Sequence, residues 1–200
     1  METRRISVLC AMLFFLLGGT VSATTYDFES VALGTYTSLD FSDLTITALD
    51  SRSFQVVDAS PGPPVSGHSL ITWFNNQTET PLFVNFKVSD VTFFSIGVGD
   101  YNADVDNTYL QAFDQFNNLL ASDYYQNPAS TYGGDYLSVS TSSPIAYVKF
   151  WDADPFPGAV YWDELTYRIG EVSVPEPATL LLLGFGLAGL ASFGRKKFKK

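Results

Sequence analysis

Short runs in which every second residue is apolar recur through the middle of this 200-residue chain. Residues 44–49 read Leu-Thr-Ile-Thr-Ala-Leu, and residues 82–88 place a leucine, two valines and a phenylalanine on one face. A period of two indicates β-strands with one buried face, because a helix repeats near 3.6 residues. Further strands are predicted at residues 91–98, 108–113, 136–140, 145–151 and 160–169.

Turn-forming residues separate these runs. Gly, Pro, Asn, Asp and Ser cluster roughly every ten residues, and Asn117-Asn118 can supply the positive φ of a tight turn. About nine to twelve short strands fill the segment, and it contains no internal repeat. The pattern therefore predicts an all-β fold, an antiparallel β-sandwich of the jelly-roll kind, over residues 24–170.

Composition adds a strong charge asymmetry. The chain is 46% hydrophobic, enough for the core of one domain. Residues 24–174 contain 19 acidic and 4 basic side chains, which gives that segment a net charge of −15. A segment with this negative charge repels nucleic acids, so no nucleic-acid partner is expected. The same charge attracts divalent cations.

The residues that most often carry catalysis are scarce. The only cysteine is Cys10, near the N-terminus, and the only histidine is His68, in a Gly/Pro/Ser-rich stretch. Serine-hydrolase elbows, zinc-protease motifs and phosphate-binding loops are absent from the sequence. We therefore expect a protein that is not an enzyme.

The N-terminus has the layout of a secretory signal peptide, residues 1–23. Arg4 and Arg5 precede an apolar run at residues 6–17, and small residues then suit cleavage after Ala23. As a helix the run would reach about 18 Å, too short for a hydrocarbon core of about 30 Å. A signal peptide is therefore favoured over a membrane-spanning helix.

The C-terminus has three elements in a fixed order. Pro175, Glu176 and Pro177 precede an apolar run at residues 178–193, and a basic cluster at 195–200 ends the chain. As a helix the run spans about 24 Å, so it crosses only a thinned bilayer. The basic cluster should stay cytoplasmic, which leaves the β-domain outside the inner membrane.

This order resembles the PEP-CTERM sorting signal, a tail also labelled ice-binding protein C-terminal. The resemblance covers the tail, residues 171–200, and is carried by Pro175, Glu176, Pro177, the apolar run and the basic end. It implies processing by signal peptidase and an exosortase, a transient stay in the inner membrane, and a final place at the cell surface or outside the cell. Such proteins occur in bacteria that make exopolysaccharide. The alternative is a permanent C-terminal anchor.

The central domain resembles the β-sandwiches of PEP-CTERM proteins and, in layout, carbohydrate-binding jelly rolls. The likeness rests on three segments: residues 26–29 (Tyr-Asp-Phe-Glu), residues 98–100 with 110–114, and residues 161–167. It implies a non-enzymatic domain that binds, or is associated with, exopolysaccharide in the extracellular matrix. The alternatives are a structural or adhesion protein without a ligand site, and a glycoside hydrolase built on two carboxylates.

Asp163 is the first candidate metal ligand. Strict alternation would place it on the same face as Leu165 and Tyr167, where an unpaired carboxylate is costly. In the jelly rolls that this chain resembles, carboxylates of the first and last strands hold a structural Ca²⁺, and Asp27, Glu29 and Asp163 match that placement. The alternative is an aspartate satisfied by protein donors.

A second, weaker metal candidate is the loop that contains Asp100, Asn102, Asp104 and Asp106, which places an oxygen at every second residue. It lacks the glycine and the final acid of an EF-hand, so a solvated acidic turn is the favoured interpretation.

The glycan-binding candidates are aromatic: Trp73, Tyr101, Trp151 and Trp162. Flat rings beside amides and carboxylates are typical of sugar-binding surfaces. Trp151 and Trp162 lie on predicted strands, however, so packing in the core is the favoured alternative for them.

Overall fold

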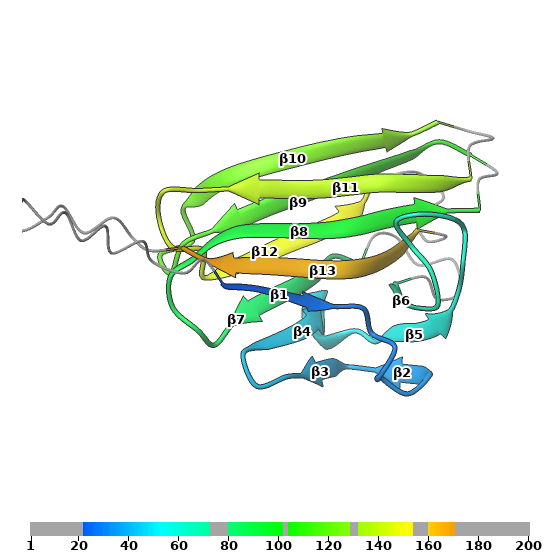
Figure 1. Cartoon of the computed structure of the whole chain (residues 1–200), viewed down its shortest axis with the longest axis horizontal. Helices are drawn as coiled ribbons and strands as arrows, with labels where there is room; N and C mark the ends of the chain where they lie inside the picture. Colours follow the sequence, from blue (N-terminus) through cyan, green and yellow to red (C-terminus); the bar gives the residue numbers. More distant parts are fainter. Residues whose placement is uncertain (1–21, 73–79, 102–103, 129–131, 154–159, 171–200) are drawn as a thin grey trace, which may run out of the picture.

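The computed structural model describes residues 22–72, 80–101, 104–128, 132–153 and 160–170. The described chain forms two antiparallel β-sheets that pack face to face (Figure 1). The predicted all-β sandwich is therefore confirmed. Residues 1–21 of the predicted leader and the sorting tail with its predicted helix lie outside the described residues, whereas Ser22 and Ala23, the last two residues of that leader, begin the first strand. No helix of the described ranges is long and apolar enough to span a membrane.

Sheet A has the strand order β11-β8-β13-β6-β5-β2, and β1 also pairs with β13. Its strands are β1 (Ser22–Tyr26), β2 (Gly34–Tyr36), β5 (Phe54–Asp58), β6 (His68–Ile71), β8 (Val91–Asp100), β11 (Gly133–Ser140) and β13 (Tyr161–Ile169).

Sheet B has the order β10-β9-β12-β7-β4-β3. Its strands are β3 (Ser38–Asp40), β4 (Leu44–Ala48), β7 (Leu82–Phe86), β9 (Asp106–Phe113), β10 (Leu119–Asn127) and β12 (Tyr147–Asp152), and a short 3₁₀ turn, η1 (Leu49–Ser51), follows β4. From β8 to β13 the chain crosses repeatedly between the sheets, as in a jelly roll.

Alternation along the strands builds the core. In β4 the buried positions are the first, third and fifth, and β9 and β12 alternate in the same way. The largest fully buried side chains come from both sheets and include Phe54, Phe94, Phe150 and Trp162. Asn117 has a φ of 64°, so the predicted tight turn between β9 and β10 is confirmed.

One departure from alternation changes the face of several residues in β13. The pairing of β13 with β8 shifts between Asp163 and Thr166, and Glu164 has a φ of 48°. This β-bulge puts Trp162, Leu165 and Tyr167 in the core, while Asp163 points to the outer side of sheet A. The prediction that Asp163 shares a face with Leu165 and Tyr167 was wrong, because strict alternation ignores the extra residue.

The segment between β5 and β6 folds over the outer side of sheet A (Figure 1). Its Pro64 packs onto Gly97 of β8, where a Cβ would lie only 2.9 Å from the Pro64 Cγ. Glycine is required at this position because the covering segment and the strand approach so closely. Asp163, the neighbour of Gly97 on β13, is buried under this cover.

Candidate functional site

Two predicted positions and the sorting motif cannot be placed. Trp73, Asn102 and the motif Pro175, Glu176 and Pro177 lie outside the described residues. The remaining candidates lie in several separate places in the sandwich.

Trp162 is part of the hydrophobic core. Its side chain is 1% exposed, and its ring centroid lies 4.8 Å from that of Phe150 in the opposite sheet. A ring enclosed between two sheets has no surface for a sugar, so the assignment of Trp162 to a glycan site was wrong. The alternative interpretation, core packing, is correct for this residue.

Asp163 is buried but satisfied by protein amides. Its carboxylate accepts hydrogen bonds from the Glu164 N–H at 2.7 Å and the Ser66 N–H at 3.2 Å. Burial raises the pKa of Asp163 to about 6, and these two bonds only partly oppose it. The negative charges of Glu164 and Glu29 raise the pKa further.

Asp27 and Glu29 occupy the exposed segment after β1. Glu29 accepts a hydrogen bond from the His68 N–H at 2.9 Å, and Asp27 accepts one from the Glu29 N–H. Within the described part of the chain, Asp27, Glu29 and Asp163 do not form a group with ligand atoms within 4.8 Å of one another. These carboxylates act as acceptors for local backbone amides.

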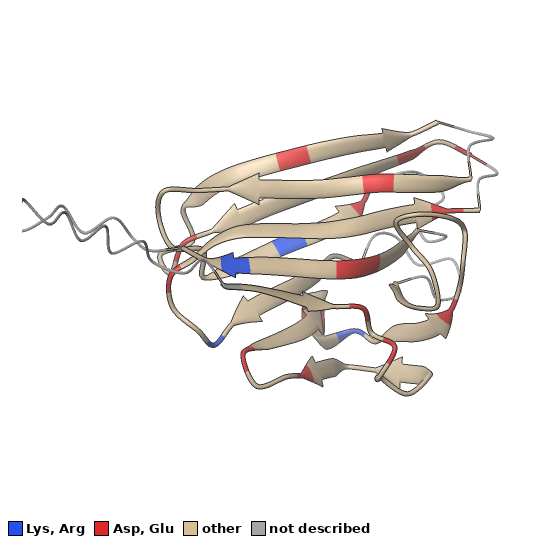
Figure 2. Cartoon of the chain, in the orientation of Figure 1, with Lys and Arg blue, Asp and Glu red and all other residues tan. Residues whose placement is uncertain are grey.

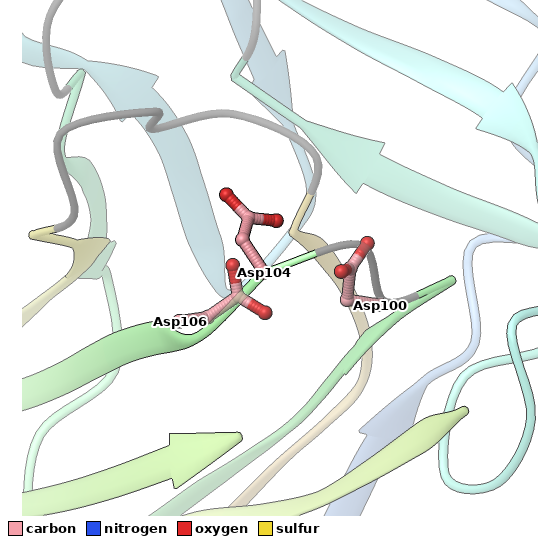
Figure 3. A group of neighbouring side chains, drawn as sticks. All are labelled: Asp100, Asp104 and Asp106. Carbon is pink, nitrogen blue, oxygen red and sulfur yellow. The ribbon is translucent and has the colours of Figure 1, made fainter. Parts of the chain in front are cut away.

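The acidic turn between β8 and β9 does bring carboxylates together. One oxygen each from Asp100, Asp104 and Asp106 lie within 4.8 Å of one another, and Figure 3 shows the three side chains around one small space. Asp100 and Asp106 are each only 2% exposed and Asp104 is half-buried, so two of these carboxylates are not solvated as the sequence favoured, although the turn itself is partly exposed. Three clustered carboxylates in a region of low dielectric have an arrangement that suits a divalent cation.

Tyr101 lies apart from the tryptophans. Its ring makes an edge contact with Tyr161 at 5.5 Å, and its hydroxyl accepts a hydrogen bond from the Ser60 N–H at 2.7 Å. Tyr101 therefore helps to hold the segment that covers sheet A, and it does not share a surface with Trp151.

Trp151 lies on the outer face of sheet B, in a ladder of three rings. The Trp151 and Tyr109 rings stack at 5.2 Å, and Tyr109 meets Tyr124 at 4.9 Å, so the ladder crosses β12, β9 and β10. The Lys149 ammonium lies 4.2 Å from the centre of the Trp151 ring. Tyr124, the last ring, is 47% exposed at the edge strand.

Polar side chains surround the exposed end of this ladder. A depression of about 430 Å³ lies between β9 and β10, with Tyr109, Gln111, Ser122 and Tyr124 in its lining. The Tyr124 hydroxyl donates a hydrogen bond to Asn107 Oδ1 at 2.5 Å. The depression thus combines two aromatic rings with an amide and a hydroxyl.

Neither Tyr109 nor Tyr124 was among the predicted glycan-binding residues. Tyr109 could have been found, because alternation in the predicted strand 108–113 separates it from buried Leu110. The position of Tyr124 opposite Tyr109 could not be predicted, because only the pairing of β10 with β9 places it there.

A second group of rings occupies the same face. The Phe113 and Tyr147 rings stack at 4.8 Å with an interplanar angle of 9°. Cross-strand ring pairs of this kind also stabilise a sheet. The outer face of sheet B is thus aromatic over much of β9 and β12, whereas acidic residues dominate the charge elsewhere (Figure 2).

Comparison with known families identifies the tail. Residues 173–196 match the PEP-CTERM protein-sorting motif, which confirms the resemblance drawn from the Pro-Glu-Pro sequence, the apolar run and the basic end. The motif indicates export and exosortase-mediated sorting to the cell surface. No curated protein matches the chain.

Several solved structures are similar to the domain. A family 61 carbohydrate-binding module in complex with β-1,4-galactotriose has 10% identity and a TM-score of 0.43, over 66% of this chain and 91% of that one. A family 11 carbohydrate-binding module of Clostridium thermocellum has 12% identity and a TM-score of 0.41, over 74% and 95%. The enzymatically active domain of tailspike protein 4 of bacteriophage CBA120 has 16% identity and a TM-score of 0.39, over 70% of this chain but only 20% of that one. At these scores the neighbours indicate nothing about the ligand of this chain.

Proposed function

We propose that the exported domain is a non-enzymatic glycan-binding protein of the cell surface or extracellular matrix. Its glycan site is the depression between β9 and β10 on the outer face of sheet B. The ligand is the exopolysaccharide with which the sorted protein comes into contact. Signal peptidase and an exosortase process the precursor, and the inner membrane holds it transiently through the C-terminal apolar segment.

One observation carries this proposal: the ring of Tyr124 at the end of the ladder is accessible, and Tyr109 and polar groups flank it. Tyr109 and Tyr124 border the depression, and Gln111 and Ser122 offer an amide and a hydroxyl beside them. Sugars present apolar C–H faces and hydroxyl groups together, so this combination suits them. The large exposed fraction of Tyr124 leaves its ring available to a ligand.

Binding of host exopolysaccharide to immobilised protein tests this site. Tyr124→Ala should weaken binding by about tenfold, which corresponds to about 1.4 kcal/mol. Tyr132→Ala is the matched control, because Tyr132 is 72% exposed and lies outside the ladder. Equal binding by both variants would refute the site, and no binding by the unaltered protein would favour a structural or adhesion role.

We further propose that the acidic turn binds Ca²⁺ through Asp100, Asp104 and Asp106. Two ligands at 2.3–2.6 Å from one calcium ion lie up to about 5 Å apart, and the three carboxylate oxygens meet that spacing. The ion would offset the repulsion between carboxylates of which two are buried.

Thermal unfolding with and without CaCl₂ tests the calcium site. At a hundredfold excess over Kd, calcium should add about 2.7 kcal/mol and raise the Tm by roughly 5–10 °C. Asp104→Asn should abolish this shift, whereas Asp163→Asn should retain it. A shift reproduced by NaCl at equal ionic strength, or lost only in Asp163→Asn, would refute the assignment.

A further inference from the structure

Both flanking segments of the chain meet the domain at the same end of the sandwich. Ser22 at the start of β1 pairs with Ile169 at the end of β13 (Figure 1). The Gly170 N–H then donates a hydrogen bond to the Asp90 carbonyl at 3.0 Å. A Cβ at Gly170 would lie 2.2 Å from Thr92 Oγ1, so the exit of the chain is fixed against the start of β8.

An open groove of about 440 Å³ lies at this end. Its apolar lining consists of Phe86, Val88, Phe116, Pro144, Ile145 and Ala146. Asp90, which holds Gly170, also borders the groove. The groove is therefore directly beside the point where the tail leaves the domain.

Phe116 stands at the rim of this groove and is 73% exposed. The turn that carries it is rigid, because the Asp114 carboxylate accepts hydrogen bonds from the Phe116 N–H at 2.8 Å and from two donors of Asn118, each at 2.9 Å. The Asn118 and Phe116 bonds lower the pKa of Asp114, so the turn stays in place at neutral pH. A large apolar ring is thus held away from the core in a defined position.

The length of the tether brings this end close to the membrane. Residues 171–177 separate Gly170 from the apolar run 178–193. Eight steps of extended chain reach at most about 29 Å, which is no more than the roughly 30 Å between the ends of the ten-residue strand β8. While the apolar run is in the bilayer, the grooved end therefore stays within this reach of the surface.

The charges at this end suit a zwitterionic surface. Arg168 is exposed two residues before the exit, and its guanidinium lies 3.7 Å from the centre of the Phe93 ring. Asp90 and Asp114 border the groove. A headgroup with a phosphate and an ammonium offers partners for both signs, whereas a purely anionic surface is repelled by the −15 domain.

We propose that this end of the sandwich docks on the outer surface of the inner membrane until the tail is removed. Phe116 enters the headgroup region, and the groove beside it covers the lipid interface. The proposal rests on the membrane stage of the proposed function. Removal of the tail ends the tether and frees the domain from the bilayer.

Lipid-borne quenching tests this docking in the leader-free, tail-bearing precursor on phosphatidylethanolamine–phosphatidylcholine vesicles. The only native cysteine lies in the leader, so Gln115→Cys and Tyr132→Cys each accept one fluorophore. Gln115 borders the groove, and Tyr132 lies next to Gly133, which pairs with Asp100 at the opposite end of β8. The label at 115 should be quenched several-fold more than the label at 132, and Phe116→Ser, but not Tyr132→Ser, should remove most of that quenching.

The possible failures are distinct. A precursor that does not float with the vesicles refutes the membrane stage of the proposed function and the docking with it. Flotation with equal or no quenching at 115 and 132 refutes the docking alone. A label at 115 that is already shielded in the tail-free protein without vesicles also overturns it, because the groove is then filled by the protein itself.

Discussion

Asp163→Asn should gain stability relative to the unaltered domain as the pH rises from about 4 to 7. Asp163 is 1% exposed beneath the segment that covers sheet A. Burial raises its pKa from 3.8 to about 6. Asparagine carries no charge, but its single acceptor oxygen can serve only one of the Glu164 and Ser66 amides, which bond different oxygens of the carboxylate. The lost hydrogen bond costs the same at every pH, whereas the removed charge changes how stability depends on pH.

The magnitude follows from the pKa. A rise of about two pKa units corresponds to about 3 kcal/mol of unfolding free energy. Between about pH 4 and pH 6 the native state holds a proton on Asp163 that the unfolded chain has already released, so stability falls as the pH rises through this window. Above about pH 6 both states are ionised, and the full cost of the buried charge remains.

Urea unfolding at several pH values from 3.5 to 7 measures this cost. The difference in unfolding free energy between Asp163→Asn and the unaltered domain should grow by up to about 3 kcal/mol across the series in favour of the variant. Asp27→Asn, at an exposed position, controls for the loss of one negative charge. A difference that stays constant with pH would refute the reasoning, because Asp163 would then titrate alike in both states.

Three further changes test other parts of the sandwich. Asp43 accepts hydrogen bonds from the Tyr26 and Tyr167 hydroxyls. Burial raises the pKa of Asp43, but these bonds outweigh burial and lower the pKa overall. Asp43→Asn should therefore be less stable than the unaltered domain above about pH 4, and urea titrations at more acidic pH should show the two converging. Trp162→Ala should cost about 3–5 kcal/mol in the same assay because it empties the core, whereas Trp151→Ala on the outer face should cost clearly less. Gly97→Ala should lower the unfolding free energy by about 1–3 kcal/mol and lower the Tm, because the added Cβ meets Pro64 of the segment between β5 and β6. An unchanged Tm would show that this segment does not pack against β8.

The fold class and the C-terminal sorting motif followed from local sequence. The alternation at residues 44–49 and 82–88 corresponds to β4 (Leu44–Ala48) and β7 (Leu82–Phe86), since a period of two records which face of a strand is buried. The sorting motif could also be predicted from the sequence, because it consists of Pro-Glu-Pro, an apolar run and a basic cluster in a fixed linear order. These features depend on neighbours in the chain and need no tertiary contact.

The candidate sites depended on tertiary structure. One residue with positive φ, Glu164, moved Asp163 to the outer side of the sheet and left Trp162 in the core. Oxygen spacing identified Asp100, Asp104 and Asp106, but their burial comes from neighbouring strands. The sequence by itself determined which residues could form strands. Strand register, β-bulges and the pairing of β10 with β9 decided which side chains meet, because strand pairing depends on partners outside each strand's own sequence.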